Sequence, residues 1–190
     1  MKNIIFVRHA KAVEENAENG DMRRPLDAIG KASIIRQRPA LRKMDISSDL
    51  VLCSPARRTR ETYEGLCDAG LLNDSQCVEF QDDLYMATAT KLYQIVKMQR
   101  NDFTNLIIIG HNPGLHQLAL ALVGVGAELD LNQLAQRFPP FSVASVSFDA
   151  NRWDDVALSA GTLDAFIYPD MSGYNAAALP GSVSAGYAFT

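Results

Sequence analysis

Three short apolar runs, separated by segments with helical periodicity, constrain the fold of this chain more than any other feature. The runs cover residues 4–7, 50–53 and 106–109 and are dominated by isoleucine, valine and leucine. Unbroken apolar runs of this length are typical of strands buried on both faces of a parallel sheet. We therefore expect the three runs to form parallel central strands.

Segments between and after these runs carry apolar side chains on one helical face, within residues 59–67, 92–96 and 115–123. Residues 28–44 also have a helical pattern, although Pro39 should kink or divide that helix. Alternating strands and helices form layered sheets in which right-handed crossovers place helices on the sheet faces. The predicted fold is an α/β three-layer sandwich, with a mostly parallel central sheet flanked by helices.

The last third of the chain carries a different strand pattern. Residues 142–148 alternate between apolar and polar side chains, and residues 149–152 are suited to a turn. Residues 156–160 can then return as the partner strand. The sequence therefore predicts a late antiparallel hairpin added to the parallel sheet.

Length, charge and cysteine pattern exclude several classes of protein. A chain of 190 residues can bury a continuous core without disulfides or structural metals. A net charge of -4 gives no overall attraction for nucleic acid or anionic lipid, so neither is an expected partner. The three cysteines are odd in number and have no zinc-ligand spacing. The first apolar run is too short for a signal peptide or membrane span, and we expect a cytoplasmic protein.

Residues 172–190 differ in composition from the rest of the chain. They contain no charged side chain and are rich in glycine, alanine and serine. Such a composition is typical of a flexible segment. We therefore predict one domain over residues 1–171 and an uncharged tail over residues 172–190, and we treat the tail as a candidate contact in a homo-oligomer.

The first group with chemical potential follows the first run directly. Arg8 and His9 stand at the carboxyl end of a predicted strand, where functional residues of open α/β sheets gather. A guanidinium can bind two phosphoryl oxygens at once, and a neutral imidazole nitrogen can attack phosphorus. Taken alone, an Arg-His pair is more often an ordinary surface feature, so the assignment depends on the other strand ends.

Polar clusters follow the other two runs as well. Residues 54–62 bring three arginines into the first turn of a predicted helix, where cations oppose the helix dipole. Anion binding explains this placement better than helix stability does, although solvated arginines are the alternative. Residues 110–114 add His111 at a strand-to-helix junction, where free backbone amides also favour an anion. Because adjacent parallel strands end at the same sheet edge, we expect His9 and His111 to face each other.

Together these motifs resemble the histidine phosphatase superfamily, which has a phosphoglycerate mutase-like fold, and within it the small SixA-type phosphohistidine phosphatases. The resemblance covers about residues 2–170 and rests on Arg8-His9, Arg24-Pro25-Leu26 with Gly30, Ser54-Pro55 with Arg58 and Thr62, and Gly110-His111-Asn112-Pro113-Gly114. It implies that His9 is the phosphorylated nucleophile and that no metal or cofactor takes part. It also implies a phosphoryl site made by Arg8, Arg58 and His111, with Arg24 at the rim and Asn112 as a further substrate-binding residue.

One departure from the superfamily bears on the substrate. Larger members carry a glutamate general acid, whereas this chain has Met86-Ala87 where that residue is sought. The remaining candidates are Asp82, Asp83 and Glu61, and each is more simply a solvated charge. A phosphorylated imidazole departs as neutral imidazole, whose conjugate acid has a pKa of about 6.5, so it needs less help from an acid than an alkoxide does.

The sequence therefore predicts a phosphatase with a phosphohistidine enzyme intermediate that acts on phosphohistidine in a protein. The alternatives are a small-molecule phosphomonoesterase, a mutase, or a non-catalytic phosphoprotein-binding module.

Cys53 is better interpreted as a small buried residue than as a nucleophile, since a cysteine-dependent phosphatase needs arginine at position 59, where this chain has threonine. His116 is five residues from His111, a spacing that does not favour a shared metal. The two site imidazoles are expected to have pKa values pushed apart by their surroundings.

Overall fold

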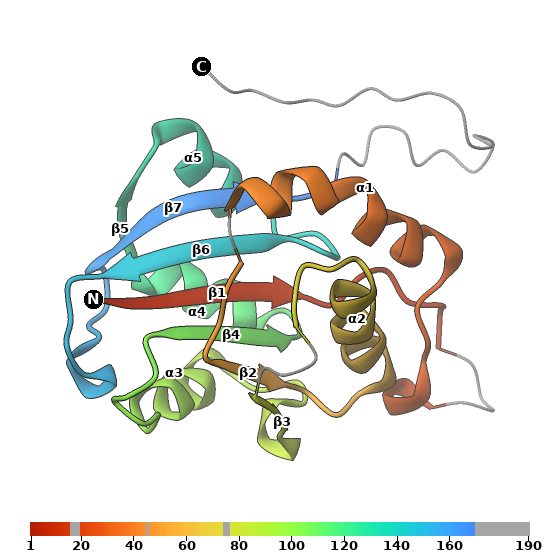
Figure 1. The fold of residues 1–190 in the computed structure, drawn as a ribbon, viewed down its shortest axis with the longest axis horizontal. Coiled ribbons are helices and arrows are strands. Elements are labelled where there is room, and N and C mark those ends of the chain that lie inside the picture. Colours follow the sequence, from red (N-terminus) through yellow and green to blue (C-terminus); the bar gives the residue numbers. More distant parts are fainter. Residues whose placement is uncertain (16–19, 45, 74–76, 170–190) are drawn as a thin grey trace.

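A single mixed sheet organises the part of the chain that the computed structural model describes, residues 1–15, 20–44, 46–73 and 77–169 (Figure 1). Within these residues, seven strands lie in the order β3-β2-β4-β1-β6-β7-β5. The strands β1 to β4 pair in parallel, β6 runs antiparallel to both of its neighbours, and β5 pairs in parallel with β7. The bounds are β1 (Lys2–Arg8), β2 (Leu50–Cys53), β3 (Cys77–Phe80), β4 (Asn105–Gly110), β5 (Val123–Gly126), β6 (Val143–Phe148) and β7 (Gly161–Ile167).

Helices cover both faces of this sheet and complete the three layers. On one face lie α1 (Ala28–Met44) and α2 (Arg57–Asp68), whose Ile34 and Leu66 belong to the same buried cluster as Val7. On the other face lie α3 (Ala89–Lys97), α4 (Gly114–Leu122) and α5 (Glu128–Gln136), which pack against the cluster that contains Phe6. Figure 1 shows α1 in front of the sheet and α4 behind it. The predicted α/β three-layer sandwich is confirmed.

The three predicted central strands are buried on both faces, as their composition indicated. Ile4 and Phe6 of β1 enter one core cluster, whereas Ile5 and Val7 enter the other. All four side chains of β2 are fully buried. Burying each large apolar side chain stabilises the fold by about 1.5–3 kcal/mol, so these strands supply a rigid base for the segments that follow them.

The late hairpin is confirmed, but its second strand was placed too early in the sequence. Residues 156–160 form no strand, and β7 begins at Gly161. The fully buried Trp153 draws the connection into the core, where residues 153–155 form a short 3-10 helix. Ser159 then adopts a left-handed backbone conformation with φ 56, which ends the loop before the chain pairs with β6.

Two helices, α1 and α4, also differ from what the sequence pattern predicts. Pro39 lies inside α1, which continues as one helix from Ala28 to Met44, so the proline does not divide it. Val123 fits the apolar face of α4 but begins β5, because it pairs with Gly161 at the edge of the sheet.

The predicted tail, residues 172–190, and the boundary at Met171 lie outside the described residues. Over the part of the chain described, no helix combines the length and apolarity that crossing a bilayer requires.

Candidate active site

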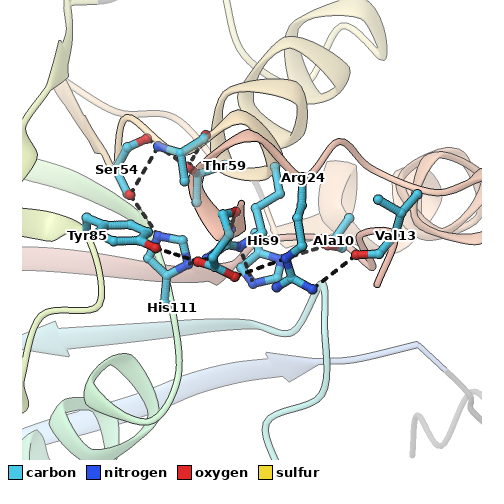
Figure 2. Close-up of polar contacts among 11 residues, drawn as sticks. His9, Ala10, Val13, Arg24, Ser54, Thr59, Tyr85 and His111 are labelled. Carbon is cyan, nitrogen blue, oxygen red and sulfur yellow. Dashed lines mark hydrogen bonds and ion pairs between the residues drawn. The ribbon is translucent and has the colours of Figure 1, made fainter. Parts of the chain in front are cut away.

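The carboxyl ends of β1, β4 and β2 lie side by side and deliver the three predicted polar clusters to one place. Strand β4 pairs with both others, with Arg8 opposite Gly110 and Cys53 opposite Ile109. The residues that follow each strand therefore emerge at the same level of the sheet. His9 and His111 meet there with ring centroids 5.3 Å apart, as the sequence predicted (Figure 2).

The hydrogen bonds of His9 determine which ring nitrogen is free to react. Its Nδ1 lies 2.7 Å from the carbonyl oxygen of Ala10, and a carbonyl can only accept, so Nδ1 carries the proton. Its Nε2 therefore holds the lone pair, and it accepts a hydrogen bond of 3.2 Å from Nε of Arg58. The backbone thus fixes the tautomer in which Nε2 is the nucleophilic atom.

Arg58 connects the two imidazoles and is itself buried, with 1% of its surface exposed. Besides the bond to His9, its Nη2 donates to Nδ1 of His111 at 3.2 Å. Its Nη1 and Nη2 also donate to the backbone oxygen and the carboxylate of Asp21, at 2.7 and 2.9 Å. A guanidinium held by these contacts is preorganised, with its planar fork fixed between the two imidazoles.

The first turn of α2 and the loop after β1 are joined through Thr62. Its hydroxyl donates to the backbone oxygen of Arg58 at 2.7 Å and accepts from the amide of Ala10 at 3.0 Å. This one side chain therefore sets the loop that carries His9 against the helix that carries Arg58. A second close approach involves Gly30 of α1, where a Cβ atom would lie 2.1 Å from the backbone oxygen of Lys11, so only glycine fits.

His111 is oriented by two contacts and is 3% exposed. Its Nε2 lies 2.7 Å from Oγ of Ser54, which follows β2, while its Nδ1 accepts from Arg58. The proton of the neutral ring is therefore on Nε2 and is donated to Ser54. Should His111 gain a second proton, it would be on Nδ1, beside the guanidinium.

A cavity of about 260 Å³ opens over these side chains. All six residues predicted for the site line it, namely Arg8, His9, Arg24, Arg58, His111 and Asn112. The backbone oxygen of Phe138 accepts from Arg8 Nη1 at 2.7 Å and from Asn112 Nδ2 at 2.9 Å. Arg24 is more exposed and donates to the backbone oxygen of Val13 at 3.0 Å, which places it toward the outer side of the cluster (Figure 2).

The other two arginines of the sequence cluster do not line the cavity. Arg57 forms an exposed ion pair with Glu61 at 2.7 Å, and Arg60 lies over the ring of Phe80 on the surface. Of the three arginines in residues 54–62, only Arg58 thus lines the cavity.

The three acids considered from the sequence also lie outside the cavity. Asp83 forms an exposed ion pair with Lys91 at 2.8 Å, and Asp82 does not line the cavity. Glu61 accepts from the amide of Leu26 at 2.7 Å as well as from Arg57. These contacts give the carboxylates structural or surface roles, and none of the three is positioned to donate a proton to a substrate in the cavity.

Asp21 is a cavity residue that sequence reasoning missed. Among the described residues it is the one acidic side chain that lines the cavity. Its carboxylate contacts Arg58, contacts Nε of Arg24 at 3.0 Å, and accepts a short hydrogen bond from the hydroxyl of Tyr85. The only signal in the sequence was its position three residues before Arg24, within the segment that leads to Arg24-Pro25-Leu26.

Neither Cys53 nor His116 lines the cavity. Cys53 is fully buried, and desolvation raises the pKa of its thiol to about 12, so it stays protonated and unreactive. His116 lies against Phe138, with its Nε2 2.7 Å from the backbone oxygen of Leu134, and does not line the cavity. Over the described residues, no group of three or more His, Cys, Asp or Glu side chains could hold a metal ion.

Burial lowers the pKa of both site imidazoles. Desolvation takes the pKa of His9 to about 3, against the opposing effect of its bond to Ala10, and the neighbouring arginines lower it further. The pKa of His111 also falls to about 3, through desolvation and then the proximity of His9 and Arg58. The two pKa values are therefore lowered together and not pushed apart as expected, because burial and the arginine charge act on both rings.

We expect the free energy of unfolding to decrease as the pH is lowered from 7 toward 4. In the unfolded chain both imidazoles gain a proton near pH 6.5, whereas in the folded protein they stay neutral down to about pH 3. Between these values the unfolded state binds more protons, so acid favours it. Urea unfolding at a series of pH values measures this slope. The variant His9→Asn should have a slope shallower by up to ~1.4 kcal/mol per pH unit, and an unchanged slope would contradict a buried neutral His9.

Comparisons with known proteins place this arrangement in a family. The model of the Histidine phosphatase superfamily (branch 1) matches residues 4–84, which include His9, Arg24 and Arg58. Uncharacterized protein ML1117 of Mycobacterium leprae is 32% identical over 120 residues, which cover 63% of this chain and 70% of that protein. The chain belongs to the histidine phosphatase superfamily.

Other comparisons extend the likeness of this superfamily member beyond the matched segment. Uncharacterized protein At3g52155, chloroplastic, of Arabidopsis thaliana is 25% identical over 184 residues, covering 90% of this chain and 79% of that protein. The solved structure of SixA from Agrobacterium tumefaciens superposes with a TM-score of 0.73 at 22% identity, covering 88% of this chain and 98% of the other. A SixA structure complexed with tungstate gives 0.67 at 21% identity, covering 87% and 96%. At these identities the structural likeness shows the shared fold, and membership of the superfamily supports a phosphatase.

Proposed function

We propose that this chain is a metal-independent phosphatase that transfers a phosphoryl group from phosphohistidine in a protein onto its own His9 and then to water. The observation that carries this proposal is the state of His9. Its ring is neutral, its Nδ1–H is held by the Ala10 carbonyl, and its Nε2 lone pair lies beside Arg58 in an accessible cavity. Such an imidazole meets the requirements of a nucleophile toward phosphorus.

In the first step, His9 Nε2 forms a bond to phosphorus while the bond between phosphorus and the leaving group breaks. Phosphoryl transfer depends mainly on in-line positioning and on positive charge around the equatorial oxygens. Arg8, Arg24 and Arg58 supply three permanent cations around one cavity. A dianion placed among them would also raise the pKa of His111, which could then donate a proton from Nδ1 to a phosphoryl oxygen.

In the second step, water attacks phosphorus and His9 becomes the leaving group. Because the Ala10 carbonyl keeps the proton on Nδ1, the ring departs as neutral imidazole with the electron pair on Nε2. Inorganic phosphate takes the oxygen and the protons of the attacking water. The same hydrogen bond that makes Nε2 a nucleophile thus makes His9 a good leaving group, and neither step calls for a metal.

The substrate assignment is supported by the shortage of proton donors in the cavity. None of the acids considered from the sequence lines it, and the carboxylate of Asp21 forms ion pairs with Arg24 and Arg58 and accepts a hydrogen bond from Tyr85. A sugar or serine alkoxide is a poor leaving group without a general acid, whereas an imidazole protonated on its second nitrogen leaves as a neutral ring. The SixA structure complexed with tungstate, which shares this fold, is described as a protein histidine phosphatase, and this description agrees with the assignment.

We expect phosphohistidine to be hydrolysed with a kcat/KM about 100-fold or more above that of alkyl phosphomonoesters. The test compares a histidine-phosphorylated carrier protein with phosphoserine and a sugar phosphate, with release of inorganic phosphate as the common measurement. Preference for the monoesters would identify a small-molecule phosphomonoesterase. Movement of phosphate within the substrate without release would indicate a mutase, and binding without turnover would indicate a phosphoprotein-binding module.

Three further assignments stay predictions. They are the division into a domain over residues 1–171 and a tail over residues 172–190, the cytoplasmic location, and the contact between copies through the tail. The net charge of -4 still gives no general attraction to nucleic acid or anionic membranes, so the proposed partner is a phosphorylated protein.

A further inference from the structure

The candidate anion site contains a hydrogen-bond acceptor that a phosphate group does not use, the carboxylate of Asp21. Phosphoryl oxygens are themselves acceptors, so cations and N–H groups suit them and a carboxylate repels them. Asp21 nevertheless lines the cavity together with the arginines, and its side chain is 30% exposed. A carboxylate in this position weakens the binding of any phosphate dianion. Its presence in the cavity therefore suggests a role beyond the stability of the fold.

Asp21 is held in its ionised form by its neighbours. Burial raises the pKa of its carboxyl, but hydrogen bonds from Tyr85 and Arg58 outweigh that effect, and the pKa lies below its ordinary value. The bond also raises the pKa of the Tyr85 hydroxyl, so the proton stays on Tyr85. Asp21 is therefore a negatively charged acceptor at neutral pH and does not act as a general acid.

Asn112 also lines the cavity, but its amide oxygen is not an acceptor for a ligand there. Its Nδ2 donates to the backbone oxygen of Phe138 at 2.9 Å, which fixes the orientation of the amide. Its Oδ1 is buried, so a ligand in the cavity does not reach it. Asp21 is therefore the acceptor that such a ligand meets.

We propose that Asp21 determines specificity by favouring substrates whose leaving group carries a proton on nitrogen, as the ring of phosphohistidine does, over phosphate esters. This inference rests on the proposed function and names a residue for its substrate preference. The ring of phosphohistidine protonated on its second nitrogen is a cation joined to a phosphoryl dianion. The carboxylate attracts the cationic ring and repels the dianion, whereas with an ester only the repulsion remains.

The same charge assists the chemical step. As His9 Nε2 bonds to phosphorus, the P–N bond of the substrate breaks and its electron pair goes to the departing ring nitrogen. The proton on the second ring nitrogen stays with the ring, which leaves as neutral imidazole. Asp21 stabilises the protonated form of the substrate ring, which is the form that can leave without a general acid, and no proton is transferred to or from Asp21.

The test measures kcat/KM of the full-length protein for a histidine-phosphorylated carrier protein and for p-nitrophenyl phosphate, whose leaving group needs no acid. Asp21→Asn keeps the size of the side chain and removes its charge. We expect this variant to lose about tenfold in kcat/KM for phosphohistidine and to gain a few-fold for the ester. Asp83→Asn is the matched control, because it removes a carboxylate whose partner is Lys91 and which lies outside the cavity.

The ratio of the two substrates separates specificity from a structural role. If Asp21 only positions Arg58, Asp21→Asn and Asp21→Ala will reduce both activities in parallel, and that result would overturn the inference. An unchanged ratio with unchanged rates would also overturn it. Thermal unfolding identifies a variant that fails to fold. Asp21→Glu then provides a second test, since it keeps the negative charge and should keep the ratio close to that of the wild-type protein. A wild-type protein with no activity on phosphohistidine would refute the proposed function itself.

Discussion

Replacing His9 with alanine should reduce kcat/KM for every phosphorylated substrate by roughly 10⁴-fold or more, because no other group takes its place as the nucleophile. The ring is partly enclosed, with 8% of its surface exposed, and its Nε2 atom contacts Arg58. Steady-state release of inorganic phosphate measures the effect. Circular dichroism and thermal unfolding establish that the variant is folded.

His116→Ala is the matched control for this experiment. His116 is also an imidazole, in the first turn of α4, but it contacts Leu134 and Phe138 and lies outside the cavity. Its loss should change kcat/KM by less than about threefold. If the two variants have similar activities, His9 is not the group that attacks phosphorus.

Replacing Arg58 with alanine should reduce kcat by about 10²–10⁴-fold, since its guanidinium lies between both imidazoles and would stabilise the charge of the transferring phosphoryl group. The free energy of unfolding should also fall by about 2 kcal/mol, because His9, His111 and Asp21 lose a buried donor together. Single-turnover kinetics and urea unfolding measure the two effects separately.

Arg58→Lys distinguishes charge from geometry at this position. Lysine keeps a positive charge but lacks the planar fork with which Arg58 reaches three partners at once. We expect the lysine variant to recover stability more than activity. Arg57→Ala is the control, because Arg57 is the preceding arginine of the same helix and its partner is the surface carboxylate of Glu61. Equal losses in the Arg57 and Arg58 variants would contradict the assignment of Arg58 to the phosphoryl site.

The central strands and the meeting of the three polar clusters could be predicted because the physics behind them is local and repetitive. Strands buried on both faces have few compositions available, and the ends of adjacent parallel strands share one edge of the sheet. His9, Ser54 and His111 each directly follow such a strand. Their proximity therefore followed once the three runs were assigned to one sheet.

The late strands were harder to place because tertiary packing decides where they begin. Residues 156–160 have strand-like composition, yet burial of Trp153 and the turn at Ser159 delay pairing until Gly161. Val123 fits a helical pattern, but it pairs with β7 instead. In both places the deciding contact is with a residue distant in sequence, which periodicity does not record.

Asp21 shows the corresponding limit for the site. It belongs to a short 3-10 helix between two longer elements, and no periodic pattern marks it. Its role depends on Arg58 and Tyr85, which lie 37 and 64 residues further along the chain. Position along the sequence points to Asp82, Asp83 and Glu61. In the structure, Asp21 is identified by the side chains that its carboxylate contacts.

The most direct measurement of the central claim is the chemistry of the trapped phosphoenzyme. The protein is incubated with a ³²P-labelled histidine-phosphorylated carrier and quenched within one turnover, and the label is located by peptide mapping. We predict an acid-labile, alkali-stable phosphoryl group on His9, attached through Nε2 and missing from His9→Ala. Label on another residue, or steady release of phosphate with no labelled intermediate in single-turnover experiments, would contradict the account.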